Sequence, residues 1–181
     1  MIVDSSIICS SRRPKKVIEF NKTTYSKDTD ARWTIKAGRP FYGYKLHMAT
    51  ESNGFILGGH ITSANFSDTK ELFNVINNIH FDKGTFLLAD KGYASLANRK
   101  QLISYGLNDG IMHNSKKLSL TQKQINSKIS SVRCSIERVF GTLKERYGFH
   151  KTKYLGIMKT KGQFLLSAIA FNLKKATTYM N

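Results

Sequence analysis

The chain has 181 residues and carries 29 Lys and Arg against 12 Asp and Glu, which gives a net charge of +17. Hydrophobic residues make up 40% of the chain, a content that argues against a disordered basic protein. The basic residues run from Arg12 to Lys175, so they do not form a basic tail on a neutral domain. Length and charge together predict one domain, residues 1–181, that binds a polyanion, either DNA or a ribosomal type of RNA.

The sequence also argues against secretion, a zinc site and a membrane span. No basic segment opens the chain, so we expect no signal peptide. The five His residues are scattered, and neither CxxC nor HExxH occurs. Residues 164–173 are apolar but too few to cross a bilayer, and we expect them to form a buried final helix. Cys9 and Cys134 lie in strand-like and helix-like runs, as expected for small buried residues of a reduced, cytoplasmic protein.

Short apolar runs predict the strands, and apolar residues at helical spacing predict the helices. In chain order we expect strands at residues 1–9, 39–50, 55–63, 86–90 and 110–113, and helices at residues 70–79, 95–105, 130–144 and 164–173. Residues 10–33 are basic, polar and irregular, and we expect a loop that touches DNA. Residues 51–54 predict a turn and residues 115–127 a polar connection. This mixed order of elements predicts an α/β fold.

The first two expected strands carry charged residues of interest. Asp4 lies inside the apolar run at residues 1–9. Because an unpaired buried carboxylate is costly, we expect a cation close to Asp4. Lys45 and His47 share one face of the strand at residues 39–50, where they point either at a phosphate or at water. We interpret His47 as part of a solvated strand face.

Most of the other acidic residues have ordinary structural interpretations. Asp68 precedes an apolar helix and Glu71 follows three residues later, a spacing typical of a capping box. Asp68 also lies in the segment TSANFSD, so a position near a functional site stays open as an alternative. Four further acidic residues lie in polar, turn-like stretches: Asp28, Asp30, Asp82 and Asp109.

Asp90 ends the apolar part of the segment TFLLADKGY, residues 85–93. A short apolar run that closes in Asp at a turn predicts a buried strand with a carboxylate at its carboxyl end. Open α/β sheets bind their ligands at this edge. Asp90 is therefore a candidate functional residue.

Arg133, Glu137 and Lys144 line one edge of the helix expected at residues 130–144. With 100° per residue and Arg133 at zero, Glu137 lies at about 40° and Lys144 at about 20°. The adjacent, buried face is expected to contain Val132, Ile136, Val139, Phe140 and Leu143. Three charged residues aligned along a helix edge beside the core indicate a functional site. The simple alternative is an i,i+4 Arg–Glu pair, which stabilises a helix by roughly 0.2–0.5 kcal/mol.

Five segments in order resemble the catalytic region of bacterial insertion-sequence transposases of the DDE class: VDSSII, YGYKLH, TSANFSD, LLADKGY and R-x3-E-x6-K. The similarity extends over roughly residues 4–176 and points to the insertion-sequence-five type, close to the insertion-sequence-four group. It implies a ribonuclease H-like α/β fold, with a mixed five-stranded sheet flanked by helices. In that fold the first and fourth strands are adjacent, so Asp4 and Asp90 are expected to be neighbours and the Glu137 helix to close the site.

The resemblance also implies the chemistry. Asp4, Asp90 and Glu137 are the expected catalytic residues and ligands of two Mg²⁺ or Mn²⁺ ions, which serve DNA nicking and strand transfer. The expected partner is double-stranded DNA, bound by a homo-oligomer at the nucleoid. The expected DNA-binding residues are Arg133, Lys144, Lys45 and Lys91. The family often has Tyr three residues before the signature Arg, whereas this chain has Ser130, so that stacking or phosphate contact is not expected.

Full-length family members carry an end-recognition region before the first catalytic Asp, which here is the fourth residue. We therefore expect the chain alone to give at most weak, non-specific nicking. Three origins stay open: a decayed copy, a downstream reading frame joined by frameshifting, and an internal start. Two other functions also stay open: a non-catalytic DNA-binding remnant, and a host structure-selective nuclease of the same fold.

Overall fold

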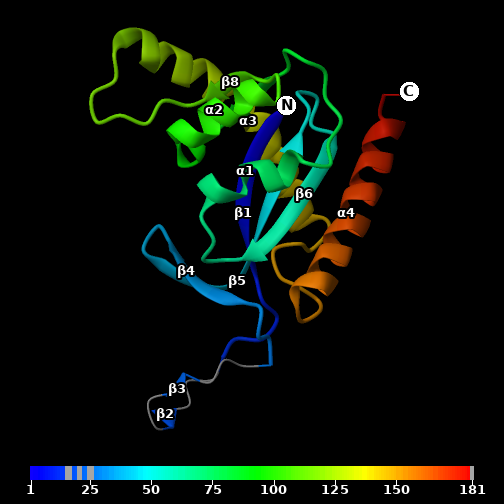
Figure 1. Ribbon diagram of the computed structural model, residues 1–181. Coiled ribbons are helices and arrows are strands. Elements are labelled where there is room, and N and C mark those ends of the chain that lie inside the picture. The colour runs from blue at the N-terminus through cyan, green and yellow to red at the C-terminus, as the bar shows by residue number, and fades with distance from the viewer. Residues whose placement is uncertain (15–17, 20–21, 24–26, 180–181) are drawn as a thin grey trace. The chain divides into compact units, whose positions relative to one another are not determined.

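The computed structural model describes residues 1–14, 18–19, 22–23 and 27–179 (Figure 1). The strands are β1 (Ile2–Cys9), β2 (Ile18–Glu19), β3 (Lys22–Thr23), β4 (Arg32–Lys36), β5 (Arg39–Thr50), β6 (Ile56–Ser63), β7 (Phe86–Ala89) and β8 (Asn108–Ile111). The helices are α1 (Asp68–Ile76), α2 (Leu96–Ser104), α3 (Leu120–Glu145) and α4 (Ile157–Thr177), with a short 3₁₀ helix η1 (Lys91–Tyr93).

Six of the described strands form one mixed sheet in the order β4-β5-β1-β7-β8, with β6 paired to β5. Strand β7 runs parallel to both β1 and β8, whereas β4 and β5 are antiparallel. Four helices flank the sheet, so the class is mixed α/β and compatible with a ribonuclease H-like fold. The sheet contains the five expected strands together with β4, which pairs with the start of β5.

The chain divides into two compact units. Unit 1 comprises Met1–Ser5, His47–His60 and Ser67–Gly141, and unit 2 comprises Ser6–Leu46, Ile61–Phe66 and Thr142–Asn181. The boundaries fall within β1, β5, β6 and α3, so these elements contribute residues to both units. One catalytic domain over residues 1–181 stays a prediction.

Apolar residues from β1, β5, β7, β8, α1 and α2 form the core of unit 1. Helix α1 illustrates why, because its buried Leu72, Phe73, Val75 and Ile76 recur at helical spacing. Their partners in the core are Val3, Ala49, Leu87, Ala89, Tyr93, Leu102, Leu107 and Ile111. Parallel strands β7 and β8 thus contribute buried side chains to this core up to their last residues, and Asp90 follows directly after β7.

In unit 2, two Asp residues hold the amino-terminal end of α4. Asp28 is only 1% exposed, and its carboxylate accepts hydrogen bonds from the hydroxyls of Ser10 and Tyr44 and, at 3.2 Å, from the Gly156 N–H. Asp30 accepts the first backbone N–H of α4 at 2.9 Å. Carboxylates are favourable at this end of a helix, where backbone N–H groups lack partners. Asp28 is therefore a buried tertiary anchor, not the turn residue that the sequence predicted.

Most expected elements are confirmed within one to four residues. Strand β5 has the expected bounds, and the turn at residues 51–54 closes with a 3.0 Å bond from Gly54 N to Glu51 O. Gly54 has a φ of +83°, which favours glycine. Ser95 caps α2 by accepting the N–H of Asn98 at 3.0 Å. The expected loop at residues 10–33 lies partly outside the described residues, and its described part is not wholly irregular, because it contains β2, β3 and the start of β4.

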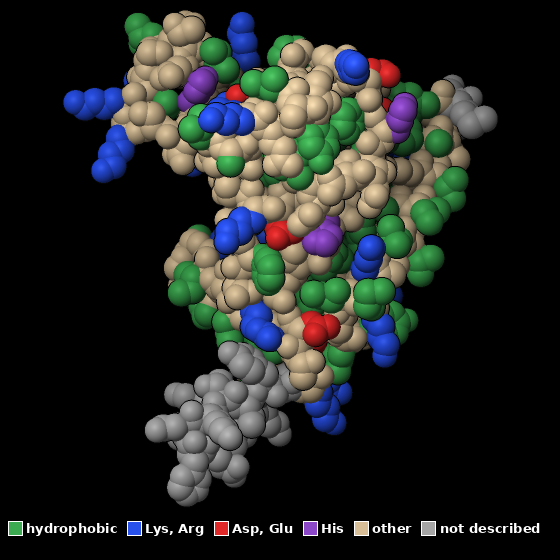
Figure 2. All heavy atoms as spheres, in the orientation of Figure 1, with side chains coloured by type: hydrophobic (Ala, Val, Ile, Leu, Met, Phe, Trp, Pro, Cys, Tyr) green, Lys and Arg blue, Asp and Glu red, His purple; other side chains and the backbone are tan. Residues whose placement is uncertain are grey.

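Several expectations about helices are wrong. Helix α3 begins at Leu120, so residues 120–127 are helical and do not form a polar connection. The cap of α1 is Ser67, and Glu71 accepts from Asn74 instead of completing a capping box with Asp68. Helix α4 buries one face only. The exposed hydrophobic residues of this helix include Met158, Leu165, Leu166, Ile169 and Leu173. Figure 2 shows hydrophobic side chains on the surface of the molecule.

Three expectations about burial are also wrong. His47 is fully buried, because β5 has protein on both faces at this point. Cys9 is half-buried and Cys134 is exposed on α3. Val132 is 42% exposed, so the buried face of α3 is narrower than predicted. Within the described ranges, no helix has both the length and the apolar character needed to cross a membrane.

Candidate active site

Asp4 and Asp90 lie next to each other because β1 and β7 pair in parallel. The register joins Ile2 to Leu88 and Val3 to Ala89, so the next residue of each strand is an Asp. Asp4 therefore lies within β1, beside Asp90 at the carboxyl end of β7, a position where α/β sheets commonly bind ligands. The predicted adjacency of these two residues is confirmed.

Each of the two carboxylates is oriented by a backbone N–H. Asp4 Oδ1 accepts from Ser5 N at 2.8 Å, and Asp90 Oδ1 accepts from Lys91 N at 2.7 Å. Asp90 is also the N-cap of η1, so a turn of helix begins at the point where its strand ends. These local bonds orient both carboxylates.

Arg133 of α3 lies against both carboxylates. Its Nη2 donates to Asp4 Oδ2 at 2.7 Å, and its Nη1 lies 3.6 Å from Asp90 Oδ1. Arg133 is 7% exposed, as its position on the inner edge of the helix predicted. The cation that the sequence required near Asp4 is therefore Arg133, supplied from a distant part of the chain.

The pKa of Asp4 reflects this environment. Burial raises the pKa of Asp4, and Arg133 and the Ser5 N–H lower it. The neighbouring Asp90 raises it again, because two like charges disfavour ionisation. Arg133 thus offsets only part of the cost of placing these carboxylates side by side.

Glu137 lies one helical turn beyond Arg133 on α3 and is exposed. Residues four apart share a helix face, so Glu137 lies on the side of α3 that carries Arg133. In the part of the chain that the structure describes, no three His, Cys, Asp or Glu side chains form a group able to hold a metal ion. Asp4 and Asp90 are brought together, whereas Glu137 is not joined to them in a cluster.

A second group of polar residues lies beside Asp90 in unit 1. The N-terminal turn of α1 is tied to η1, because the Thr69 hydroxyl donates to Gly92 O at 2.8 Å. A Cβ at Gly92 would lie 3.9 Å from Asp68 Oδ2. His47 Nδ1 lies 3.7 Å from Asp68 Oδ1. Asp68 is therefore near the site, the alternative that its sequence segment left open, and His47 is close to it.

Tyr93 lies near both the Asp4–Asp90 pair and Asp68. Tyr93 is 1% exposed, and burial raises the pKa of its phenol, with further contributions from Asp68 and then Asp4. The Ser5 side chain and the charge of Arg133 act in the opposite direction. Tyr93 is therefore close enough to Asp68 and to Asp4 for both charges to act on its phenol. The segment LLADKGY contains Tyr93, but no pattern in the sequence singles this residue out.

Comparison with known proteins identifies the family. A family model described as "Transposase DDE domain" matches residues 1–173. The chain belongs to the transposase DDE domain family. It is 36% identical over 191 residues to a protein of Neisseria meningitidis serogroup B named "Transposase for insertion sequence element IS1106". The match covers 99% of this chain and 66% of the relative, so the chain spans about two thirds of the relative's length. No solved structure matches.

The remaining predicted DNA-binding residues of this DDE transposase domain lie on both units. Lys91 is exposed in unit 1, directly after Asp90. Lys45 and Lys144 belong to unit 2. Lys45 Nζ donates to Phe66 O at 2.7 Å. Burial lowers the pKa of Lys144, and the charge of Lys36 lowers it further, whereas Cys9 raises it.

DDE transposase domains generally use divalent metal ions. Asp4 and Asp90 present carboxylate oxygens, which are the ligands that Mg²⁺ and Mn²⁺ prefer. The raised pKa of Asp4 indicates that additional positive charge at this pair would be favourable. The two carboxylates therefore fit a hard divalent cation, which would share with Arg133 the neutralisation of their charge.

Proposed function

We propose that this chain performs metal-dependent phosphoryl transfer on DNA, by nicking the ends of an insertion sequence and joining them to a target. The observation that carries the proposal is the pair Asp4 and Asp90, side by side on parallel neighbouring strands with Arg133 against both. Family membership supports the same reaction class.

In this proposal Asp4, Asp90 and Glu137 hold Mg²⁺ or Mn²⁺, with two ions bound in the active complex. Bound divalent ions activate a water molecule or a DNA 3′-hydroxyl and stabilise the leaving oxygen of an in-line displacement. Asp4 supplies ligand oxygens from within β1, and Asp90 supplies them from the carboxyl end of β7. Glu137 supplies its exposed carboxylate from the side of α3 that carries Arg133.

The basic residues position the DNA. Arg133 lies against the carboxylates and is suited to hold a phosphate oxygen beside the metal site, because its guanidinium forms several directed hydrogen bonds. Lys91, Lys144 and Lys45 contact the DNA backbone. Figure 2 shows Lys and Arg side chains scattered over the visible face, so many other cations share the sequence-independent binding.

The proposal also includes the setting in which the chain acts. The partner is double-stranded DNA, both the element's ends and the target, in the bacterial cytoplasm. A homo-oligomer is the active form, because joining two ends to one target requires two active sites.

Nicking of supercoiled plasmid DNA in the presence of Mn²⁺ tests this function. We expect wild-type protein to convert plasmid to the open-circular form, and Asp90→Asn and Glu137→Gln to reduce the rate by at least about 100-fold. Glu145→Gln is the matched control, because Glu145 is exposed on the same helix and loses the same charge. Equal nicking by Glu137→Gln and Glu145→Gln would remove Glu137 from the site. DNA binding without nicking by wild type would indicate a non-catalytic remnant.

A further inference from the structure

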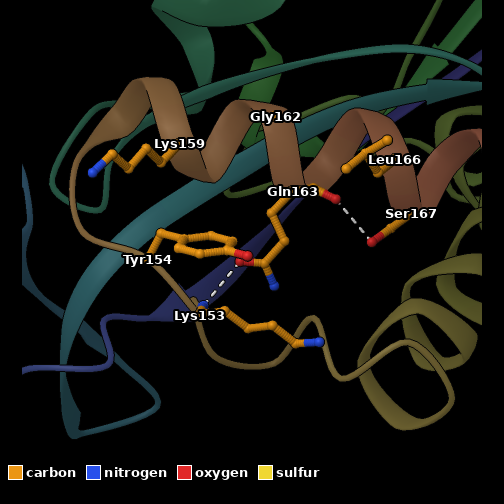
Figure 3. A pocket seen from close by; sticks show the side chains of 7 residues that line it. All are labelled: Lys153, Tyr154, Lys159, Gly162, Gln163, Leu166 and Ser167. Atoms are coloured by element: carbon orange, nitrogen blue, oxygen red, sulfur yellow. Dashed lines mark hydrogen bonds between the residues drawn. The ribbon is translucent and has the colours of Figure 1, made fainter.

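Unit 2 contains a pocket between the segment before α4 and the first turns of that helix (Figure 3). Its volume is about 520 Å³, within the range of small-molecule sites in proteins. All of its lining residues lie between Lys153 and Ser167, so one short stretch of chain builds it. None of the lining residues is acidic.

Gln163 supplies a hydrogen-bond donor to this pocket. Its Oε1 accepts the backbone N–H of Lys153 at 2.9 Å, which orients the amide group because an N–H requires an oxygen acceptor. Gln163 is 9% exposed, and among the described residues its Nε2 has no hydrogen-bond partner. An unpaired buried N–H group is costly, so this position favours a ligand that carries an acceptor atom.

Aromatic and cationic side chains surround this donor. The ring of Tyr154 is 55% exposed at the pocket, and Leu166 adds exposed apolar surface. A Cβ at Gly162 would meet nothing within 4 Å, so this part of the helix leaves space open. Lys153 and Lys159 are exposed and line the pocket, and Figure 3 shows their amino groups extending away from it on different sides.

We propose that this pocket binds an unpaired nucleobase of DNA. The base stacks on the ring of Tyr154, and one of its acceptor atoms receives the hydrogen bond of Gln163 Nε2. Lys153 and Lys159 bind the phosphates on either side. Stacking on an aromatic ring tolerates every base, and each base also carries an acceptor atom, so the site takes unpaired nucleotides with little sequence preference. The proposal rests on the proposed function only in that its ligand is DNA.

The test compares two duplexes that differ by one extrahelical 2-aminopurine nucleotide. We expect wild-type protein to bind the duplex with the extra base at least about fivefold more tightly than the fully paired duplex. Fluorescence of the 2-aminopurine should fall on binding, because stacking quenches it. Tyr154→Leu should abolish both effects, and Tyr179→Leu, at another exposed tyrosine, should leave both intact.

A second variant isolates the hydrogen bond. Gln163→Glu keeps the oxygen that accepts the Lys153 N–H but replaces the Nε2 donor, so we expect it to lose the preference as well. Gln101→Glu, at an exposed residue of α2, controls for the added negative charge. Circular dichroism and melting temperature confirm that each variant is folded. If Gln163→Glu fails to fold, the binding preference measured for Tyr154→Leu decides whether the pocket binds an unpaired base.

The outcomes separate this proposal from the proposed function. Equal binding of the two duplexes by wild type, or an unchanged preference in Tyr154→Leu, would overturn the nucleobase site even if Mn²⁺-dependent nicking is observed. A preference that depends on Tyr154 in a protein without nicking activity would support the nucleobase site and contradict the catalytic proposal alone.

Discussion

Arg133 donates a 2.7 Å hydrogen bond to Asp4 across 129 positions of the sequence. The bond joins helix α3 to the first strand beside a second carboxylate, Asp90, which follows the last residue of β7. Both side chains of the pair are largely buried, at 9% and 18% exposure. The pair therefore links the stability of unit 1 to the geometry of the candidate active site.

Replacing Arg133 by Gln should lower the free energy of unfolding by about 3 kcal/mol, because it leaves Asp4 buried without its cation. Urea denaturation measures the loss. Arg138→Gln, at an exposed position of the same helix, should change stability by less than about 0.5 kcal/mol. Equal effects of the two variants would show that the Asp4 pair contributes nothing specific.

Millimolar Mn²⁺ should raise the melting temperature, because the ion binds the folded site and not the unfolded chain. Asp90→Asn should remove most of this rise. It should leave the metal-free protein at least as stable as wild type, because Asp90 repels Asp4. Differential scanning calorimetry with and without Mn²⁺ measures both quantities. A metal-free Asp90→Asn protein that melts well below wild type would mark Asp90 as a structural residue.

Asp68→Asn should slow Mn²⁺-dependent nicking by roughly 10–100-fold, the usual effect of removing a residue that supports metal ligands. The reason is its position beside Gly92 and its electrostatic influence on Tyr93. The affinity for DNA should not fall, because a negative charge is lost. Nicking rates and fluorescence-anisotropy titrations distinguish the two effects. Asp82→Asn, at an exposed residue of unit 1, should behave as wild type.

Lys144→Met should raise the melting temperature at pH 7. Burial lowers the pKa of Lys144 from its ordinary value near 10.5, so the unfolded chain binds this proton more tightly. Stability therefore rises with pH between the folded pKa and about 10.5, and the charged side chain opposes folding below that window. The gain should shrink as pH approaches 10.5. A gain that grows with pH would contradict the sign of the shift, and Lys151→Met at an exposed position is the control.

Asp28→Ala should cost about 3 kcal/mol of stability, because it leaves the buried hydroxyls of Ser10 and Tyr44 without their acceptor. Hydrogen exchange should show that the first turn of α4 loses protection, since the Gly156 N–H is also freed. Unchanged protection there would mean that the helix end does not depend on Asp28. Asp82→Ala serves again as an exposed control.

Much of the fold could be predicted because its elements follow local rules. Strand β5 and the edge of α3 that carries Arg133 depend on residues two to four apart, and periodicity reports that spacing directly. The wrong predictions concern features that depend on contacts between distant residues. Polar residues at the start of α3 made residues 120–127 resemble a connection, although a helix can extend into solvent when its later turns are packed. The metal-ligating role of Glu137 stays a prediction.

The sequence by itself determines the residue types of the site. These are an Asp in a strand, an Asp after a strand and an Arg–Glu pair on a helix. The sequence by itself also determines the net charge of +17 and the order of the main strands and helices. Tertiary structure decided which of these residues meet. The parallel register of β1 and β7 placed Asp4 beside Asp90, and packing buried His47 and Asp28, which both look solvated in sequence. The physical reason is that contacts between distant segments depend on register and packing, which no local spacing encodes.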